Sequence, residues 1–192
     1  MKVKMKADDI LFPAPALVIG TYGEDFRANA MTVAWAGICS SEPPCIMISI
    51  RESRKTYENI KLHKAFTVNV PDFKHAAEVD YFGLVSGREE DKFEQSGLTP
   101  SKSGVDAPLI EEFPFALECN LKESFEVGSH IMVVGEIVNI QVDESCVEKN
   151  GKIDVRKIDP LILNTAENEY LSIGERTFPA FEPGLKFKKS KE

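Results

Sequence analysis

Short runs of strand-forming residues, each bounded by Gly, Pro, Asn or Asp, dominate this chain and restrict it to a mostly β fold. They cover residues 16–21, 31–35, 45–50, 66–70, 115–122, 131–142, 161–164 and 170–173. Helical patterns are few: residues 53–63, residues 72–84, and a shorter stretch after Asp91 that Gly97 can end. The sequence therefore predicts a mostly β fold with a few helices.

The run from Ile131 to Ile140 has apolar residues at both odd and even positions, whereas a half-buried strand alternates apolar and polar residues. We therefore expect both faces of this strand to be covered, as in a closed or nearly closed barrel whose outside packs on a helix or on a second subunit. A homodimer is the partner that this pattern predicts.

Two connections are predicted to be hairpin turns, one at Gly23-Glu24-Asp25 and one at Gly128-Ser129. Residues 143–159 are expected to form an exposed excursion. No linker or repeat divides the 192 residues, so we expect a single domain over 1–192, with a core at about 10–175. The basic ends, residues 2–6 and 186–191, are expected to be solvated tails.

The chain carries a formal net charge of −8, with a pI near 5.1, which argues against general nucleic-acid binding. No apolar run is long enough to span a membrane, and no signal-like segment is evident, so we expect a cytoplasmic protein with no membrane partner. The cysteines, Cys39, Cys45, Cys119 and Cys146, have no metal-binding spacing, and we expect no metal site. A redox pair of Cys39 with Cys45 is the alternative.

Cations cluster where the first helix is predicted to begin, at Arg51, Arg54 and Lys55. The first turn of a helix has unpaired N–H groups and favours negative charge, so cations there suggest that a bound phosphate completes the site. Ser53 and Thr56 add hydroxyl groups. The alternative is that Ser53 only caps the helix while the cations face water. No dinucleotide fingerprint, P-loop, serine hydrolase elbow or zinc protease motif is present.

An ordered set of motifs resembles the flavin reductase-like FMN-binding family, and its flavoredoxin branch in particular. In chain order the matching segments lie at residues 13–18, 29–35, 48–57, 66–69, 86–93, 117–119 and 127–136. The resemblance implies an FMN-binding split β-barrel, usually a homodimer, that passes electrons from NAD(P)H to flavin or onward to an acceptor. FMN is favoured over FAD because one compact phosphate site is evident without an adenosine fingerprint.

The resemblance also implies which residues would contact each part of a tightly bound FMN. The strand residues Thr32, Val33, Ala34 and Trp35 would face the flavin ring, with main-chain groups meeting its polar edge. Along the ribityl chain and ring would lie Ser49, Ile50 and Arg51. The phosphate would be held by Ser53, Arg54, Lys55 and Thr56, the residues that the cationic helix start also indicates.

Other residues keep two interpretations. Asn29 either orients its strand or faces the flavin, and Trp35 either stacks near the ring or fills the core. Ser86 and Lys92 belong to the matching pattern; Lys92 either stabilises charge on the reduced ring or lies in solvent beside Phe93.

His130 occupies the position that the family pattern associates with nicotinamide binding, and a structural role for this histidine is the alternative. No residue is expected to be catalytic in its own right, because the flavin carries the chemistry. The sequence departs from the family pattern at Ser129, where an acidic residue is common, and at Ala34, where a serine is frequent. Three functions follow: an NAD(P)H-dependent flavin oxidoreductase, an electron carrier with a redox protein partner, and a flavin-binding module without redox turnover.

Overall fold

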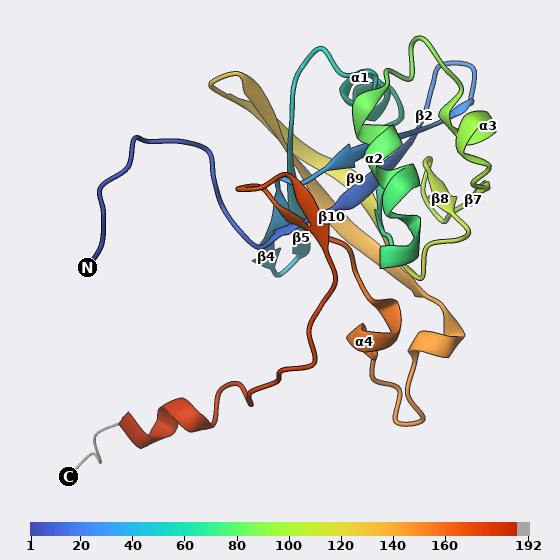
Figure 1. Ribbon diagram of the computed structural model, residues 1–192. Helices are drawn as coiled ribbons and strands as arrows, with labels where there is room; N and C mark the ends of the chain where they lie inside the picture. The colour runs from blue at the N-terminus through green and yellow to red at the C-terminus, as the bar shows by residue number, and fades with distance from the viewer. Residues whose placement is uncertain (188–192) are drawn as a thin grey trace.

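A computed structural model describes residues 1–187, and its main feature is a seven-stranded antiparallel sheet in the order β3-β2-β6-β9-β10-β5-β4 (Figure 1). The strands of this sheet are β2 (Leu17–Tyr22), β3 (Ala28–Val33), β4 (Ala36–Ser41), β5 (Pro44–Ile50), β6 (Ala65–Val70), β9 (Phe115–Val127) and β10 (His130–Val142). The mostly β prediction is confirmed.

The sheet curls into a barrel that stays open along one seam. Its two edge strands, β3 and β4, are consecutive in the chain and are joined only through residues 34 and 35, yet no ladder pairs them. The main-chain N–H of Ser49 donates to the carbonyl of Trp35 at 2.8 Å and so holds the end of β5 against the connection between β3 and β4, which is called the crossing below. A closed barrel is therefore not formed, because β4 pairs with β5 and leaves the outer edge of β3 free.

Two apolar cores lie on opposite faces of the sheet, and β2 contributes to both. Leu17 and Ile19 face the barrel interior together with Ile48, while Ala16 and Val18 pack on the outside under the helices. Successive residues of a strand point to opposite faces, so a strand that is apolar at both parities is covered on both sides.

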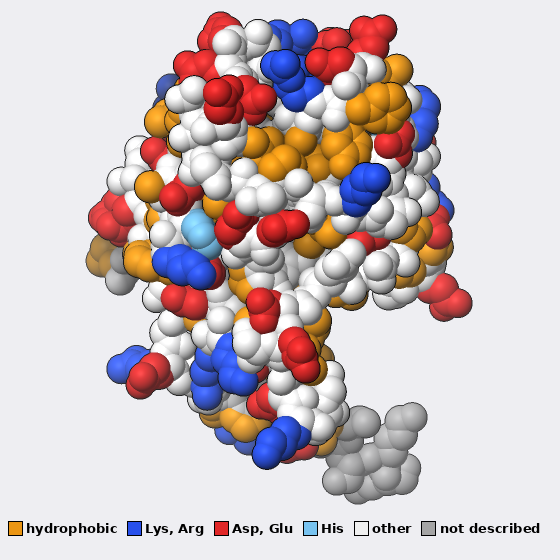
Figure 2. Space-filling model, turned by 90° about the vertical axis from the view of Figure 1, so that its right-hand side faces the viewer, with side chains coloured by type: hydrophobic (Ala, Val, Ile, Leu, Met, Phe, Trp, Pro, Cys, Tyr) orange, Lys and Arg blue, Asp and Glu red, His pale blue; other side chains and the backbone are white. Residues whose placement is uncertain are grey.

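Two helices, α2 (Ala76–Leu84) and α3 (Lys92–Ser96), cover the outer face of β2 and β3 (Figure 1). The third, α1 (Lys55–His63), packs Tyr57 and Ile60 into the interior core with Ile19. α3 ends at Gly97, whose φ of 74° is the left-handed conformation expected there. Figure 2 views this helical side and shows acidic and basic side chains interspersed rather than gathered into a basic patch.

Small elements complete the described chain. They are β1 (Ala14–Pro15), β11 (Ile162–Asn164) and β12 (Glu169–Leu171) in one sheet, β7 (Pro100–Lys102) and β8 (Pro108–Ile110) in another, and η1 (Phe73–His75), η2 (Glu144–Cys146), α4 (Val155–Ile158) and η3 (Pro183–Phe187). Residues 188–191 of the expected basic tail lie outside the described residues.

The outer face of β10 differs from the expectation that both of its faces would be covered. Ile131 and Val133 are buried inside the barrel, whereas Met132 and Val134, at the other parity, are only partly buried. Within residues 1–187 no helix packs on this outer face. The described residues therefore leave this face partly exposed, and its cover by a second subunit stays a prediction.

Candidate functional site

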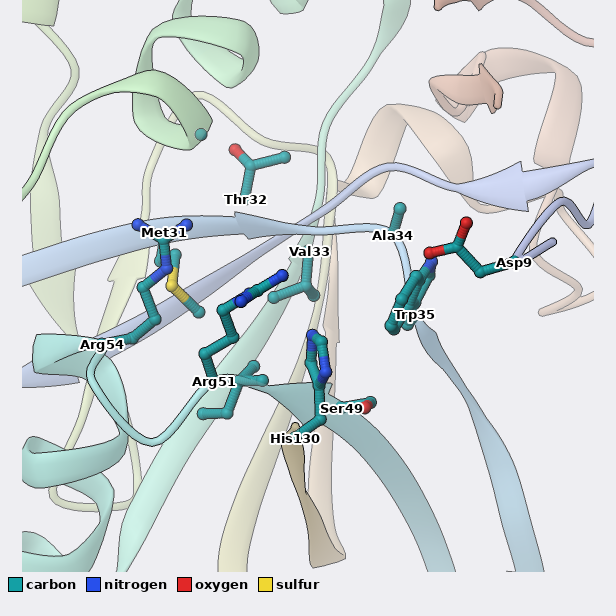
Figure 3. Close-up of a pocket in the computed structure, with 12 residues that line it drawn as sticks. Asp9, Met31, Thr32, Val33, Ala34, Trp35, Ser49, Arg51, Arg54 and His130 are labelled. Atoms are coloured by element: carbon teal, nitrogen blue, oxygen red, sulfur yellow. The ribbon is translucent and has the colours of Figure 1, made fainter. Parts of the chain in front are cut away.

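The open seam of the barrel holds a cavity of about 300 Å³. One wall is β3 and the residues that connect it to β4, and the opposite wall is the end of β5 and the start of β10 (Figure 3). Gly83 of α2 also lines the cavity. The lining residues are Asp9, Met31, Thr32, Val33, Ala34, Trp35, Ser49, Ile50, Arg51, Arg54, Gly83 and His130. The structure thus brings together residues that the sequence analysis assigned to the flavin ring.

A smaller cavity of about 110 Å³ adjoins the first and shares Met31, Arg54 and Gly83 with it. Its charged lining side chains are all cationic: Arg54, Lys55, Arg88 and Lys92. The remaining lining residues are Asn29, Ser53, Thr56, Phe82, Val85, Ser86 and Gly87. A small cavity with four cations and no carboxylate is suited to an anion of phosphate size.

The start of α1 adds main-chain donors to this smaller cavity. The N-cap residue is Arg54, in an extended conformation, and its side chain makes no capping hydrogen bond. The alternative in which Ser53 caps the helix is therefore wrong. An uncapped first turn leaves N–H groups available to an anion, and the helix dipole favours negative charge at this end.

Asn29 fixes the start of α1 to the sheet. Its side chain is buried, and its Nδ2 donates to Thr21 Oγ1 at 3.3 Å and to Thr56 Oγ1 at 3.2 Å. Asn59 Nδ2 donates to the same Thr21 hydroxyl at 3.0 Å. Asn29 thus has a structural role, made through side chains rather than through the backbone of its own strand, and it also lines the smaller cavity.

Lys92 is a buried cation, with 4% of its surface exposed, so the alternative that it lies in solvent is wrong. Its Nζ donates to the carbonyls of Ala30 at 2.9 Å and Phe82 at 2.8 Å. Burial, and to a lesser extent the positive charge of Arg54, lowers the pKa of Lys92 to about 8. A bound anion would favour the charged form of this amine. Lys92 lines the smaller cavity and not the larger one, which favours a role at the phosphate over one at the ring.

The β3 wall offers its main chain to the larger cavity. β3 is an edge strand that pairs only with β2, so its outward-facing N–H and C=O groups form no ladder, although the carbonyl of Ala30 accepts from Lys92. The hydroxyl of Thr32 donates to the carbonyl of Val79 on α2, and its side chain points away from the cavity (Figure 3). The main chain of β3 can therefore form hydrogen bonds with a ligand in the larger cavity, as the resemblance implied for this strand.

Two flat side chains face each other near the mouth of the larger cavity. The rings of Trp35 and His130 lie 4.8 Å apart, centroid to centroid, with 40° between their planes. Trp35 is 39% exposed and lies in the crossing between β3 and β4, so it is not a core residue. His130 Nδ1 lies 2.9 Å from Ser129 Oγ.

All of the sequence-predicted site residues line one of the two cavities. Several further lining residues were not assigned from the sequence, among them Gly83, Gly87 and Arg88. Gly87 and Arg88 follow Ser86 directly within a matching motif, so the signal for them was present. No cluster of potential metal ligands occurs among the described residues, and no helix in residues 1–187 has the length and apolarity needed to cross a bilayer.

Comparison with known proteins identifies the family of this chain. The family model described as flavin reductase like domain matches residues 10–169. The structure of a flavoredoxin from Desulfovibrio vulgaris (Miyazaki F) is 42% identical, with 96% of this chain and 100% of that chain covered at a TM-score of 0.91. A flavoredoxin from Methanosarcina acetivorans is 30% identical, with 97% and 99% covered at a TM-score of 0.90. A flavin reductase from Pseudomonas putida is 26% identical over 69% of this chain and 75% of its own length.

Proposed function

The chain belongs to the flavin reductase-like domain family, and from this premise we propose that it binds FMN and passes reducing equivalents from NAD(P)H through the bound flavin. The observation that carries the proposal is the pair of adjoining cavities. One has the cationic lining that suits a phosphate, and the other is larger and is bordered by an edge strand whose main chain can meet the polar edge of a heterocycle.

The residues fit FMN in the following way. Ser53, Arg54, Lys55 and Thr56, with Lys92 and Arg88, would hold the phosphate by charge-assisted hydrogen bonds. The ring would lie against the main chain of residues 32–35, with Ser49 and Ile50 on the other side. When bound, FMN would supply the hydride and electron chemistry, while the protein orients the ring and limits the access of water.

Electron transfer to a protein partner is the second candidate. It is favoured by the resemblance to two proteins that are named flavoredoxins and by the exposure of Trp35, which lies at the cavity mouth where a partner could approach. The four cysteines are free, which supports the further proposal of a reducing, cytoplasmic location.

The phosphate assignment is tested with FMN and riboflavin, which differ only by the phosphate. We expect Arg54→Ala with Lys55→Ala to weaken FMN binding to the apoprotein by about a hundredfold, because two charge-assisted contacts are lost, and to leave riboflavin binding nearly unchanged. Titration of flavin fluorescence measures both affinities.

Arg156→Ala with Lys157→Ala is the matched control, since it also removes an adjacent Arg and Lys at a helix start. Lys157 donates to the carbonyl of Ser145 much as Lys55 donates to that of Gly87. Unchanged FMN affinity in the Arg54/Lys55 variant would refute the phosphate site.

Anaerobic mixing of the FMN-loaded protein with NADH or NADPH then separates the two candidate functions. Bleaching of the flavin supports the oxidoreductase, and the absence of bleaching supports the carrier.

A further inference from the structure

Lys92 is a buried lysine without an acidic partner. Its exposed fraction is 4%, and no carboxylate of the described residues lies within 4.0 Å of its amine. An exposed lysine without a partner is ordinary, but a lysine is almost never fully buried unless it is paired, because a buried charge without a counter-charge is costly. The charged form of Lys92 therefore lacks the negative group that would stabilise it.

The charged side chains that share the smaller cavity with Lys92 increase this need. They are Arg54 and Lys55 at the start of α1 and Arg88 in the loop after α2. β3, which accepts one of the hydrogen bonds of Lys92, carries no titratable side chain. The acidic side chains on the surrounding elements, all farther than 4.0 Å from the amine, are Glu58 of α1, Glu78 and Asp80 of α2, Glu89, Glu90 and Asp91 of the loop, and Glu94 of α3. The neighbouring phenol of Tyr81 donates to Glu90 instead.

The hydrogen bonds of Lys92 leave one position of its amine for a ligand. Nζ donates to the carbonyls of Ala30 and Phe82, and an ammonium has a third hydrogen. A neutral amine has two hydrogens and a lone pair, so it can make the same two bonds while the third position becomes an acceptor. The two carbonyls are thus satisfied in either protonation state, and only the third position, at the smaller cavity, changes from donor to acceptor.

A phosphate at this cavity would change the proton affinity of the amine. Burial, and to a lesser extent the positive charge of Arg54, lowers the pKa of Lys92 to about 8. A phosphate would raise this pKa again, by its negative charge and by accepting a hydrogen bond from the third position. A phosphate monoester loses its second proton near pH 6, so at pH 8 and above it brings no proton with it. The proton must then come from solvent.

We propose that Lys92 is a proton-linked ligand of the phosphate site: its neutral amine takes up a proton from solvent when the phosphate of FMN binds, and loss of that proton at alkaline pH weakens the hold on the cofactor. One N–H bond forms at Nζ, and the proton donor is water or buffer. The inference rests on the proposed function and specifies how pH regulates that same site.

The sign of the pH effect follows from the two states of the site. Lys92 carries its proton in the empty site only below its lowered pKa, so FMN binding needs no proton uptake at pH 7 and needs it increasingly above pH 8. We expect FMN affinity to fall by about fivefold to tenfold between pH 7.5 and pH 9, while the affinity for riboflavin, which lacks the phosphate, stays nearly constant.

Isothermal titration calorimetry of the apoprotein in two buffers that differ in ionisation enthalpy, neither of them phosphate, measures the proton uptake directly. We expect about half a proton or more per FMN at pH 8.5, almost none at pH 7, and none with riboflavin at either pH.

Three variants assign the proton to Lys92. Lys92→Met should bind FMN more weakly and without proton uptake. Lys55→Met removes another cation of the same cavity and should weaken FMN binding but keep most of the uptake. Lys157→Met is the control outside the site, because Lys157 also donates to a main-chain carbonyl but is exposed, and it should keep both the affinity and the uptake.

Several outcomes would overturn the inference: FMN binding without proton uptake at pH 8.5, equal uptake with riboflavin, uptake retained in Lys92→Met, or uptake lost in Lys55→Met. If Lys92→Met does not fold, the comparison of FMN with riboflavin in the parent and in Lys55→Met still decides. Failure of the parent to bind FMN at pH 7 would instead refute the proposed function.

Discussion

His63, the last residue of α1, lies between two oxygen acceptors. Its Nδ1 is 2.7 Å from Asp106 Oδ2, and its Nε2 is 2.9 Å from the carbonyl of Gly23. Both nitrogens can donate only when the ring is protonated, and a helix C-terminus also favours a cation. Burial by itself would lower the pKa of His63, but the hydrogen bonds to Asp106 and Gly23 outweigh it and raise the pKa above its ordinary value.

This raised pKa fixes the sign of a pH effect on stability. The stabilisation by His63 should be complete below the pKa of an unfolded histidine, about 6.5, and should be lost as pH rises through the higher folded value. The neighbouring Tyr22 stays neutral in this window, because burial and the charge of Asp106 raise its pKa further. We expect His63→Gln to lower the free energy of unfolding by about 1 to 2 kcal/mol at pH 5.5 and by less at pH 8.5.

Urea unfolding of the parent protein and of His63→Gln at the two pH values measures this difference. Asp106→Asn is the companion variant and should remove the pH dependence from the opposite partner. Equal destabilisation by His63→Gln at both pH values would contradict the protonated pairing.

The loop between α2 and α3 closes the smaller cavity by a very close approach of the main chain. A Cβ at Gly87 would lie 1.9 Å from Oδ1 of Asn29, whose side chain is buried and already holds Thr21 and Thr56. Lys55 Nζ donates to the carbonyl of Gly87 at 3.0 Å, so the same residue also positions one of the cations that we propose to hold the phosphate. Only glycine permits this contact.

Gly87→Ala should therefore displace the loop and weaken FMN binding by about tenfold while the barrel stays folded. Flavin titration and circular dichroism measure the two properties. Gly37→Ala on β4 is the matched control, because nothing lies within 4 Å of the added methyl group. Unchanged affinity in Gly87→Ala would show that the loop does not shape the cofactor site.

Several helices and strands were predicted from the sequence. The strand that was missed and the strand that was predicted too short each have a clear physical cause. α1 and α3 were found because apolar spacing and a terminal glycine mark them. β4 was missed because its residues from Ala36 to Ser41 are, apart from Ile38, small or polar and are mostly exposed, so no alternation is evident. β9 continues to Val127, past the expected end at Lys122, because cross-strand pairing with β10 stabilises a polar segment.

At the scale of the whole molecule, an apolar face adjoins the larger cavity. Met132 pairs with Ser49 on one side and with Phe125 on the other, so these residues share one face of the sheet, and Ser49 also lines the cavity. Phe125 is 44% exposed and Val127 is 50% exposed. We propose that a second copy of this chain covers this face and borders both flavin sites.

Phe125→Glu should accordingly convert a dimer into monomers, because it places a charge in an apolar interface, and should weaken FMN binding at the same time. Sedimentation velocity at micromolar concentration measures the assembly. Leu62→Glu is the control, since Leu62 is similarly exposed but lies on α1. A parent protein that sediments as a single chain would refute the proposal.

The sequence by itself determined the strand-rich class, the first helix and the cationic start of that helix, because these depend on local periodicity and on residues close together in the chain. Ordered motifs were enough to indicate the family. The tertiary structure decided that the barrel stays open between β3 and β4, that Lys92 is buried at the smaller cavity beside other cations, and that Arg51, Trp35 and His130 line one larger cavity. These features depend on which distant segments meet when the sheet curls, and no local pattern encodes that meeting.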